Sequence, residues 1–233
     1  MLEVLNYEVY GLERAVIAAG LPMSTDSDKI QYSEDRAKRL GNVPAGSGHN
    51  AYLKGIVVEA RIKYPLYWSK QFQRYHFADI VSSQSTMHRV TKFNLKEQCN
   101  KYVDERIIKI VNHKIEMYNY MIENKIDILY IAPLIIRDEG FYSKDYEEAK
   151  KILFGDYGNG EELITTTKQD LFIEIISNLP SGFEMEMEIV TNYLQLQTIY
   201  NQRKNHKLPD WKVFCEWCES LPKFKEFCLG GND

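Results

Sequence analysis

The longest regular pattern in this sequence is a series of apolar side chains that recur every three or four residues after Asn94. This spacing places them on one stripe of an α-helix, so we expect a long helix that Asn94 caps and that ends near Asn124. The segment Gly55–Lys63 instead alternates in part and is rich in β-branched residues, which predicts a strand. A chain with both patterns predicts an α+β fold.

Several shorter elements are expected, each bounded by a capping residue, a glycine or a proline. The expected helices are Gly11–Ala19, Ser143–Phe154, Gln169–Asn178 (capped by Thr167 or Thr166), Met187–Lys204 and Asp210–Phe227 (kinked near Pro222), and Asp127–Ile136 is expected to be a buried strand or short helical pieces. The C-terminal half is therefore helix-rich. We find no internal repeat and no linker, so residues 1–233 predict a single domain.

Composition narrows the class of protein. The 233 residues are 44% hydrophobic and 27% charged, which is typical of a globular domain. The net charge of −4 provides no basic field and argues against duplex nucleic acid as a ligand. No apolar run approaches the roughly 20 residues that span a bilayer, and the N-terminal segment lacks a signal-peptide pattern. We therefore expect a cytoplasmic protein without a membrane segment.

The four cysteines are too few for a disulfide framework in a chain of this length, which fits a reducing compartment. Cys215 and Cys218 form a single CxxC inside a helical pattern. A zinc site would need two further ligands at a matching spacing, and a redox CxxC normally begins a helix after a strand. We interpret the pair as two buried thiols of the last helix and predict no metal site.

The segment Pro65–Arg89 concentrates aromatic rings, amides, hydroxyls and cationic side chains. Ring faces combined with guanidinium and imidazole donors suit a flat heterocycle that carries phosphate. The same composition is typical of a subunit interface. The residues alone leave both interpretations open.

A second polar region lies in the expected helix Met187–Lys204. Its polar face is rich in amides and poor in Glu and Lys, with Asn192, Gln195 and Asn201 or Gln202 near one face and Thr191 and Thr198 beside them. One interpretation is that these amides, together with Arg203, point into a ligand site. The other is a polar helix–helix or subunit interface.

Four sequence blocks, in this order, resemble the flavin-dependent thymidylate synthases, the ThyX family. Residues 70–76, Lys-Gln-Phe-Gln-Arg-Tyr-His, are similar to the hallmark R-Q-x-x-R-H-R, and residues 82–89 are similar to S-x-N-E-x-S-x-R-Y after an apparent three-residue insertion. Upstream, His49 followed by the strand Ile56–Ile62 is similar to the family's lead-in. Downstream, Leu179-Pro180 followed by residues 191–203 is similar to its L-P … N-x-R-x-L-x-x-F-x-x-x-R helix.

This resemblance implies a twisted antiparallel sheet flanked by helices, assembled as a homotetramer with FAD and dUMP sharing a pocket between subunits. The positions that match cofactor contacts are Arg74, His76, Asn192 and His49. The positions that match groups around the nucleotide are Gln71, Arg89, Arg203, Gln84 and Ser85.

The sequence departs from the hallmark at several positions. Tyr75 and His76 replace its His and second Arg, Ser85 replaces its Glu, Met87 replaces its Ser, and Leu194 replaces the Arg of N-x-R. Met87 offers no donor to a pyrimidine or a phosphate.

Three hypotheses follow. The first is FAD-dependent methylation of a pyrimidine nucleotide, of the dUMP to dTMP type, with a reduced folate as one-carbon donor. The second is a catalytically inactive ThyX-like protein that binds or sequesters a nucleotide or a protein partner, for example a phage-encoded accessory or anti-defence protein. The third is a single-stranded nucleic-acid binder that uses the aromatic and basic residues of the Pro65–Arg89 segment, which the acidic net charge disfavours.

Overall fold

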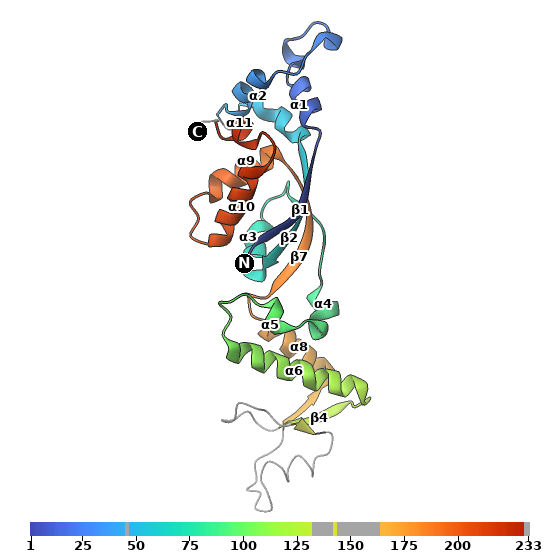
Figure 1. Ribbon diagram of the computed structural model, residues 1–233. Coiled ribbons are helices and arrows are strands. Elements are labelled where there is room, and N and C mark those ends of the chain that lie inside the picture. Colours follow the sequence, from blue (N-terminus) through green and yellow to red (C-terminus); the bar gives the residue numbers. More distant parts are fainter. Residues whose placement is uncertain (45–46, 132–141, 144–163, 231–233) are drawn as a thin grey trace, which may run out of the picture. The chain divides into compact units, whose positions relative to one another are not determined.

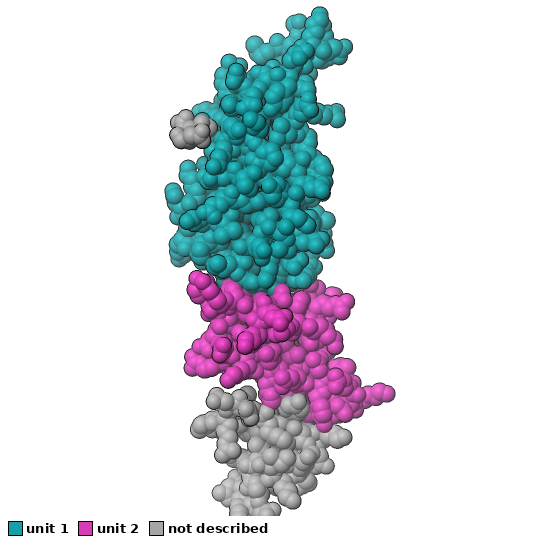
Figure 2. Space-filling view, in the orientation of Figure 1, with its two compact units in different colours: residues 1–84, 184–233 teal, residues 85–183 magenta. Residues whose placement is uncertain are grey.

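The computed structural model describes residues 1–44, 47–131, 142–143 and 164–230 (Figure 1). The chain divides into two compact units, shown in separate colours in Figure 2. Unit 1 comprises residues 1–84 and 184–233, and unit 2 comprises residues 85–183. The α+β fold predicted from the sequence is confirmed.

Unit 1 is built on a four-stranded antiparallel sheet. Its strands are β1 (Glu3–Tyr10), β2 (Val57–Pro65), β7 (Glu184–Asn192) and β3 (Asp79–Ser83), in the order β1-β2-β7-β3. The central strands β2 and β7 pair in unbroken register along their whole length. The predicted antiparallel sheet flanked by helices is therefore present.

One face of this sheet is apolar because side chains alternate along each strand. Val58, Ala60 and Ile62 of β2 are fully buried, and Met187 and Ile189 of β7 are buried beside them. Three helices lie on one side of the sheet (Figure 1): α3 (Leu66–Phe72), α9 (Tyr193–Arg203) and α10 (Pro209–Ser220).

An aromatic cluster joins α3 to α10. The ring of Trp68 stacks on Phe72 with centroids 4.8 Å apart and lies 4.9 Å from Trp211 and 5.8 Å from Phe214. All four side chains are fully buried. Large aromatic side chains contribute the most buried area per residue, so this cluster fixes where α10 lies on α3.

The remaining elements of unit 1 are short. They are α1 (Leu12–Ala18), η1 (Leu21–Met23), η2 (Ser27–Lys29), α2 (Glu34–Gly41), η3 (His49–Gly55) and α11 (Phe224–Cys228). Helix α11 packs against α2 and α9, and η3 packs against α1, α2 and α9.

Unit 2 has its own core. Its elements are α4 (Thr86–Arg89), η4 (Val90–Lys92), α5 (Leu95–Gln98), α6 (Glu105–Glu123), β4 (Ile128–Ile131), β5 (Tyr142–Ser143), β6 (Ile164–Thr167) and α8 (Lys168–Asn178). The strands form a sheet in the order β5-β4-β6. Met117 and Met121 of α6 pack with Leu129 and Leu171. In the described part of the chain, no helix has the length and apolar character to cross a membrane.

The single long helix expected from Asn94 to Asn124 is wrong. Asn94 caps only the short helix α5, and α6 begins at its own cap, Asp104, whose side chain accepts a hydrogen bond from the amide N–H of Arg106. Between them, Asn100 donates its amide N–H to the carbonyl of Gly182 at 3.0 Å. This hydrogen bond to a residue distant in sequence interrupts the helix between α5 and α6, although the apolar periodicity of the sequence runs on through the interruption.

The helix expected at Met187–Lys204 is also wrong in its first part. Residues 184–192 form the strand β7, in which glutamates alternate with apolar residues. The helix starts only at Tyr193, because the side chain of Asn192 caps it. Of the glutamates in this strand, Glu184 is buried.

The last expected helix, Asp210–Phe227, consists of two. Helix α10 ends at Ser220, and α11 starts after Lys223, which adopts a left-handed conformation with φ of 60°. Pro222 lies in this break, as the predicted kink suggested. The expected helix Ser143–Phe154 lies outside the described residues except for Ser143, which belongs to β5. Ile128–Ile131 of the run Asp127–Ile136 is strand β4, and the rest of the run lies outside the described residues.

Candidate functional site

Helix α9 presents one side to the core and another to a cleft. Tyr193, Leu196 and Ile199 are fully buried, and Asn192 fixes the start of the helix by accepting a hydrogen bond from the Gln195 amide N–H at 3.0 Å. The strand β7 runs directly into this cap, so the sheet sets the direction of the helix. The opposite side of α9 is left for polar residues.

The cleft beside α9, called the α9 cleft below, has a volume of about 540 Å³. It is lined by Leu194, Gln197, Thr198, Asn201 and Gln202 of α9, by Gly48, Asn50, Ala51 and Lys54 of η3 and its cap, and by Val43. Pockets for small molecules and cofactors are typically about 300 to 1,000 Å³, so the cleft is large enough for a nucleotide-sized ligand.

The lining of the α9 cleft favours an anion. Among the described residues that line it, Lys54 is the one charged side chain and none is a carboxylate. Two other hollows, on the open face of the sheet, are lined by glutamates such as Glu59 and Glu188. Amide and ammonium donors suit a phosphorylated heterocycle, whereas the carboxylates of the sheet face repel one.

Gln197 fixes the floor of the α9 cleft. Its side-chain nitrogen donates to the carbonyls of Gly41 at 3.0 Å and Cys228 at 2.9 Å, which end α2 and α11. Its carbonyl oxygen accepts from Asn50 Nδ2 at 3.4 Å. Because both hydrogens of this amide are used, the three elements around the cleft are tied to one side chain.

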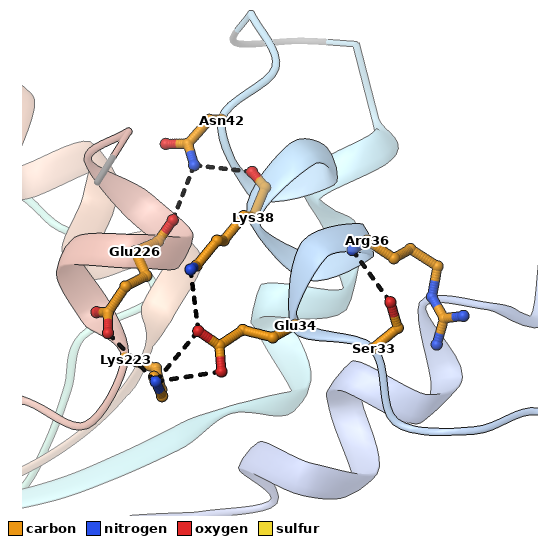
Figure 3. Close-up of polar contacts among 7 residues, drawn as sticks. All are labelled: Ser33, Glu34, Arg36, Lys38, Asn42, Lys223 and Glu226. Carbon is orange, nitrogen blue, oxygen red and sulfur yellow. Dashed lines mark hydrogen bonds and ion pairs between the residues drawn. The ribbon is translucent and has the colours of Figure 1, made fainter. Parts of the chain in front are cut away.

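Charged and amide groups join α2 to α11 near the cleft wall (Figure 3). Glu34 of α2 pairs with Lys38 at 3.0 Å and with Lys223 at 3.2 Å, and Asn42 Nδ2 donates to the carbonyls of Lys38 and Glu226 at 2.8 and 3.0 Å. The hydrogen bond with Lys38, followed by that with Lys223, lowers the pKa of Glu34. These contacts hold the end of α2, from which the chain continues into the cleft wall.

Next to the cleft lies a group of residues that we call the Arg203 network: Gln71, Tyr75, Gln202, Arg203 and Trp211. Arg203 donates from Nε to the Tyr75 hydroxyl at 2.7 Å and from a terminal nitrogen to Gln71 Oε1 at 3.4 Å. Its guanidinium carbon lies 4.7 Å from the Trp211 ring centroid. Trp211 Nε1 donates to Gln71 Oε1 at 2.9 Å.

The Arg203 network contains two site residues expected from the resemblance and one residue at which the chain departs from the hallmark. Gln71 and Arg203 are brought together, but they contact each other and Trp211. Tyr75, at the position of the hallmark His, is buried and donates its hydroxyl to Gln202 Oε1 at 3.1 Å. Since Gln202 lines the α9 cleft, it connects the network to the cleft.

The other expected site residues of unit 1 fall into two groups. Gln84 uses its side-chain oxygen to accept the Glu186 amide N–H at 2.9 Å, so it extends the strand pairing. Arg74, His76 and His49 are exposed, and their side chains make no hydrogen bond or ion pair with the described residues. They are available to a ligand.

Two expected site residues belong to unit 2. Ser85 is half-buried and precedes α4, and Arg89 is exposed at the end of that helix. Across the described ranges of both units, no group of three or more His, Cys, Asp or Glu side chains is placed to hold a metal ion. Cys215 and Cys218 are both buried in α10, in keeping with their interpretation as buried thiols.

Sequence reasoning found part of the cleft. The polar face expected on α9 includes Thr198, Asn201 and Gln202, which do line it, whereas Gln195 is buried on another side. Lys54 and Asn50 were missed. The only feature of the sequence near them is the preceding Gly48 and His49, and no sequence pattern indicates that this segment lies beside α9.

Comparison with solved structures identifies the fold. The chain is similar to Thymidylate Synthase X (ThyX) from Helicobacter pylori, solved with FAD and dUMP, with a TM-score of 0.57 and 13% identity over 97% of this chain and 95% of that one. The chain has a ThyX fold. A second ThyX structure from H. pylori, complexed with FAD and dUMP, gives a TM-score of 0.54 at 12% identity over 97% and 96% of the two chains.

The ThyX fold also matches a different enzyme. The UMP/dUMP methylase PolB from Streptomyces cacaoi, bound with 5-Br dUMP, gives a TM-score of 0.56 at 10% identity over 99% of this chain and 93% of that one. No protein-family model matches the sequence, and no curated protein sequence matches it. At these identities the likeness concerns the fold alone.

Proposed function

We propose that this chain binds a nucleotide in the α9 cleft. The observation that carries the proposal is the cleft itself: it has the volume of a ligand pocket, and the lining residues that the structure describes provide amide groups and one cation but no carboxylate. It lies in a chain whose fold matches, over 97% of its length, a ThyX solved with FAD and dUMP. Amides read the edge of a heterocycle, and an ammonium group binds phosphate.

The donor set of the cleft fits a flavin nucleotide. The amides of Gln202 and Asn50 suit the carbonyl and N–H groups at the edge of a flavin ring, and Lys54 suits a phosphate. Bound FAD would supply hydride transfer. We assign Arg74, His76, His49 and Asn192 to the cofactor, as the resemblance implies.

The residues expected around a nucleotide substrate differ in whether their side chains are already bonded within the chain. For Arg89 and Ser85, contact with the nucleotide is what the resemblance alone implies. Gln71, Arg203 and Gln84 are bonded within the chain, so we assign them to holding the walls of the site.

We propose two forms of this function. The first is FAD-dependent methylation of a pyrimidine nucleotide, of the dUMP to dTMP type, with a reduced folate as one-carbon donor. The second is nucleotide binding without catalysis, as in a phage accessory or anti-defence protein. The bonds that Arg203 and Gln71 make within the chain favour the second form, because the Nε donor of Arg203 is taken by Tyr75 and the side-chain oxygen of Gln71 is taken by Arg203 and Trp211.

The visible absorbance spectrum of the purified, dialysed protein separates these forms. Bound flavin absorbs in the visible range, where protein alone does not, and its presence with conversion of dUMP would support methylation. A nucleotide released on denaturation, without flavin, would support binding alone. A protein that carries neither, and whose melting temperature neither FAD nor dUMP raises, would contradict the proposal.

Substitution of Lys54 tests whether the α9 cleft is the place of binding. Lys54→Ala is expected to weaken nucleotide affinity by at least about tenfold, since it removes one charge-assisted contact worth about 1.5 to 3 kcal/mol. Lys96→Ala, an exposed lysine of unit 2, is the matched control and should leave affinity unchanged. Equal affinities of the two variants would place binding elsewhere.

We also propose a cytoplasmic homotetramer, as the resemblance implies. Light scattering at several protein concentrations measures the mass of the assembly. A monomer at all concentrations would contradict it.

A further inference from the structure

Two segments of unit 1 that are far apart in sequence form a basic surface. The segments are residues 65–78 and 193–209, and neither contains an Asp or a Glu. Their Lys and Arg residues are Lys70, Arg74, Arg203, Lys204 and Lys207. Because the whole chain has a net charge of −4, this surface has the opposite sign from the molecule. Such a local field attracts an anion whatever the total charge is.

The Arg203 network places the two segments side by side, since Arg203 donates to both Tyr75 and Gln71. The carboxylates that follow the segments lie apart from the basic side chains. Asp79 pairs with β7 on the face of the sheet that the helices leave open, and Asp210 is fully buried and accepts two hydrogen bonds. Neither segment therefore neutralises its own cations.

Four cations of this surface are available to a ligand. Their side chains are exposed and make no ion pair or hydrogen bond with the described residues, and they are Lys70, Arg74, Lys204 and Lys207. Basic residues favour the C-terminal ends of helices, which accounts for Lys70 in α3 and Lys204 after α9. This preference does not account for Arg74 and Lys207, which lie beyond the helix ends.

One exposed aromatic ring accompanies these cations. Phe77 is 70% exposed, and its carbonyl oxygen accepts a hydrogen bond from the Thr191 hydroxyl at 2.9 Å, which fixes the backbone beneath the ring. The rings of Trp68, Phe72 and Tyr75 are buried in the core of unit 1. Among these aromatic residues, Phe77 is therefore the one that can stack on a base.

We infer that this basic surface binds single-stranded nucleic acid. The four available cations contact phosphates of the backbone, and an unpaired base stacks on Phe77. A duplex offers the same phosphates but keeps its bases stacked inside, so it leaves Phe77 unused. This activity goes beyond the binding of a mononucleotide in the α9 cleft and does not depend on it.

Fluorescence anisotropy with a labelled strand of about 20 thymidylates tests the inference on the purified protein. Each neutralised phosphate of a single strand contributes about −0.7 to the slope of log affinity against log salt. Four contacts therefore predict a slope of about −3 and a loss of affinity of about 50-fold between about 50 and 200 mM salt. A wild-type chain that does not bind the strand at the lower salt concentration overturns the inference.

The double variant Lys204→Ala/Lys207→Ala removes two of the four contacts. Its slope is expected to be about −1.5, and its affinity at low salt should fall at least about tenfold. The resemblance implies no cofactor or substrate contact at either position, so the loss is not that of the α9 cleft. Lys29→Ala/Lys225→Ala removes the same charge at exposed lysines that already form ion pairs, and it should bind as the wild type does.

Phe77→Ala tests the stacking contact. It is expected to weaken binding at least about fivefold and to leave the salt slope unchanged, because it removes no charge. Tyr102→Ala, at an exposed aromatic residue of unit 2, is its control and should keep the affinity. Equal affinities of either variant and its control would overturn the inference.

Competition with polyglutamate distinguishes nucleic acid from an acidic protein. If polyglutamate displaces the labelled strand as well as an unlabelled strand does, the surface takes acidic proteins and the inference is overturned. Binding of dUMP is measured separately in the same variants. A chain that binds dUMP but not the strand contradicts this inference alone, and one that binds the strand but neither FAD nor dUMP contradicts the proposed function alone.

Discussion

Single side chains in unit 1 hold segments that are distant in sequence, and Asp210 is the most deeply buried of the charged ones described. It is 0% exposed, yet it accepts hydrogen bonds from the Leu2 amide N–H at 2.7 Å and from the Tyr67 hydroxyl at 2.8 Å. A buried carboxylate is tolerated only with such donors. Asp210, in α10, therefore ties down the segment just before β1 and helix α3.

Asp210→Asn is expected to destabilise the protein by about 2 kcal/mol, because an amide has one acceptor oxygen and turns an NH2 group toward the second donor. Urea unfolding measures the loss. Asp28→Asn, at an exposed position, is the control and should change stability by less than about 0.5 kcal/mol. Similar values for the two variants would contradict the role of Asp210.

At this scale the sequence predicts local contacts but misses distant ones. A cap at Thr167 or Thr166 is expected for α8, and the structure shows Thr167 as the cap, in a reciprocal capping box with Asp170. Gln71 and Arg203 were expected at a ligand, yet both bond to Trp211 or its neighbours. Periodicity carries no information about which residues of α3 and α10 meet, so the Arg203 network could not be predicted.

At the scale of elements, the junction of α2 with α11 depends on the absence of a side chain at Gly41. A Cβ built there would lie 2.0 Å from the Phe227 carbonyl oxygen. The carbonyl of Gly41 also accepts from Gln197, so a shift of α2 would move the floor of the α9 cleft.

Gly41→Ala is therefore expected to destabilise the protein by about 1 to 3 kcal/mol, although alanine normally favours a helix. Thermal unfolding checks this. Gly230→Asn is a suitable control, because that left-handed position is open and asparagine tolerates its φ of 88°. A Gly41→Ala variant more stable than wild type would show that α11 is not packed as described.

The thiols of α10 and α11 are expected to be unreactive near neutral pH. Burial raises the pKa of Cys215 from 9.0 to about 11 and raises the pKa values of Cys218 and Cys228 as well. Folding thus favours the protonated thiols, and the contribution of Cys215 to stability is full below about pH 9 and is lost as pH rises through about 11. Thiol labelling at pH 7.5 should be slow until urea unfolds the chain. Rapid labelling of native Cys215 or Cys218 would contradict the packing.

Element boundaries show where sequence reasoning succeeds. The strand at Val57–Pro65 and the helices α1 and α8 were expected almost at their observed ends. The strand at residues 184–192 is not predicted from the sequence, because the apolar spacing from Met187 onward is continuous with the helical pattern of α9. The strand forms there because β2 and β3 pair with it on both sides, which is a tertiary effect.

For the whole molecule, the ordered blocks were more informative than any single motif. They indicated the ThyX fold, although the hallmark residues themselves are altered. The position of the α9 cleft could not be derived from them, because its lining joins η3 to α9 from opposite ends of the chain.

The sequence predicts that the whole chain is a single domain, so the two compact units are expected to unfold together. The segment 85–183 leaves from β3 and returns into β7, and these strands are paired neighbours. We expect one cooperative transition in calorimetry, with equal calorimetric and van't Hoff enthalpies. Two separate transitions would show that unit 2 unfolds as an independent domain.

The pairing of β2 with β7 has a consequence for how the chain is made. Strand β2 is complete at Pro65, but its main partner begins only at Glu184. During synthesis, β2 therefore pairs only with β1, and its apolar face stays uncovered by β7 until more than a hundred further residues have been made. Such distant pairing folds slowly, so the yield of native protein should depend on temperature and chaperones during synthesis.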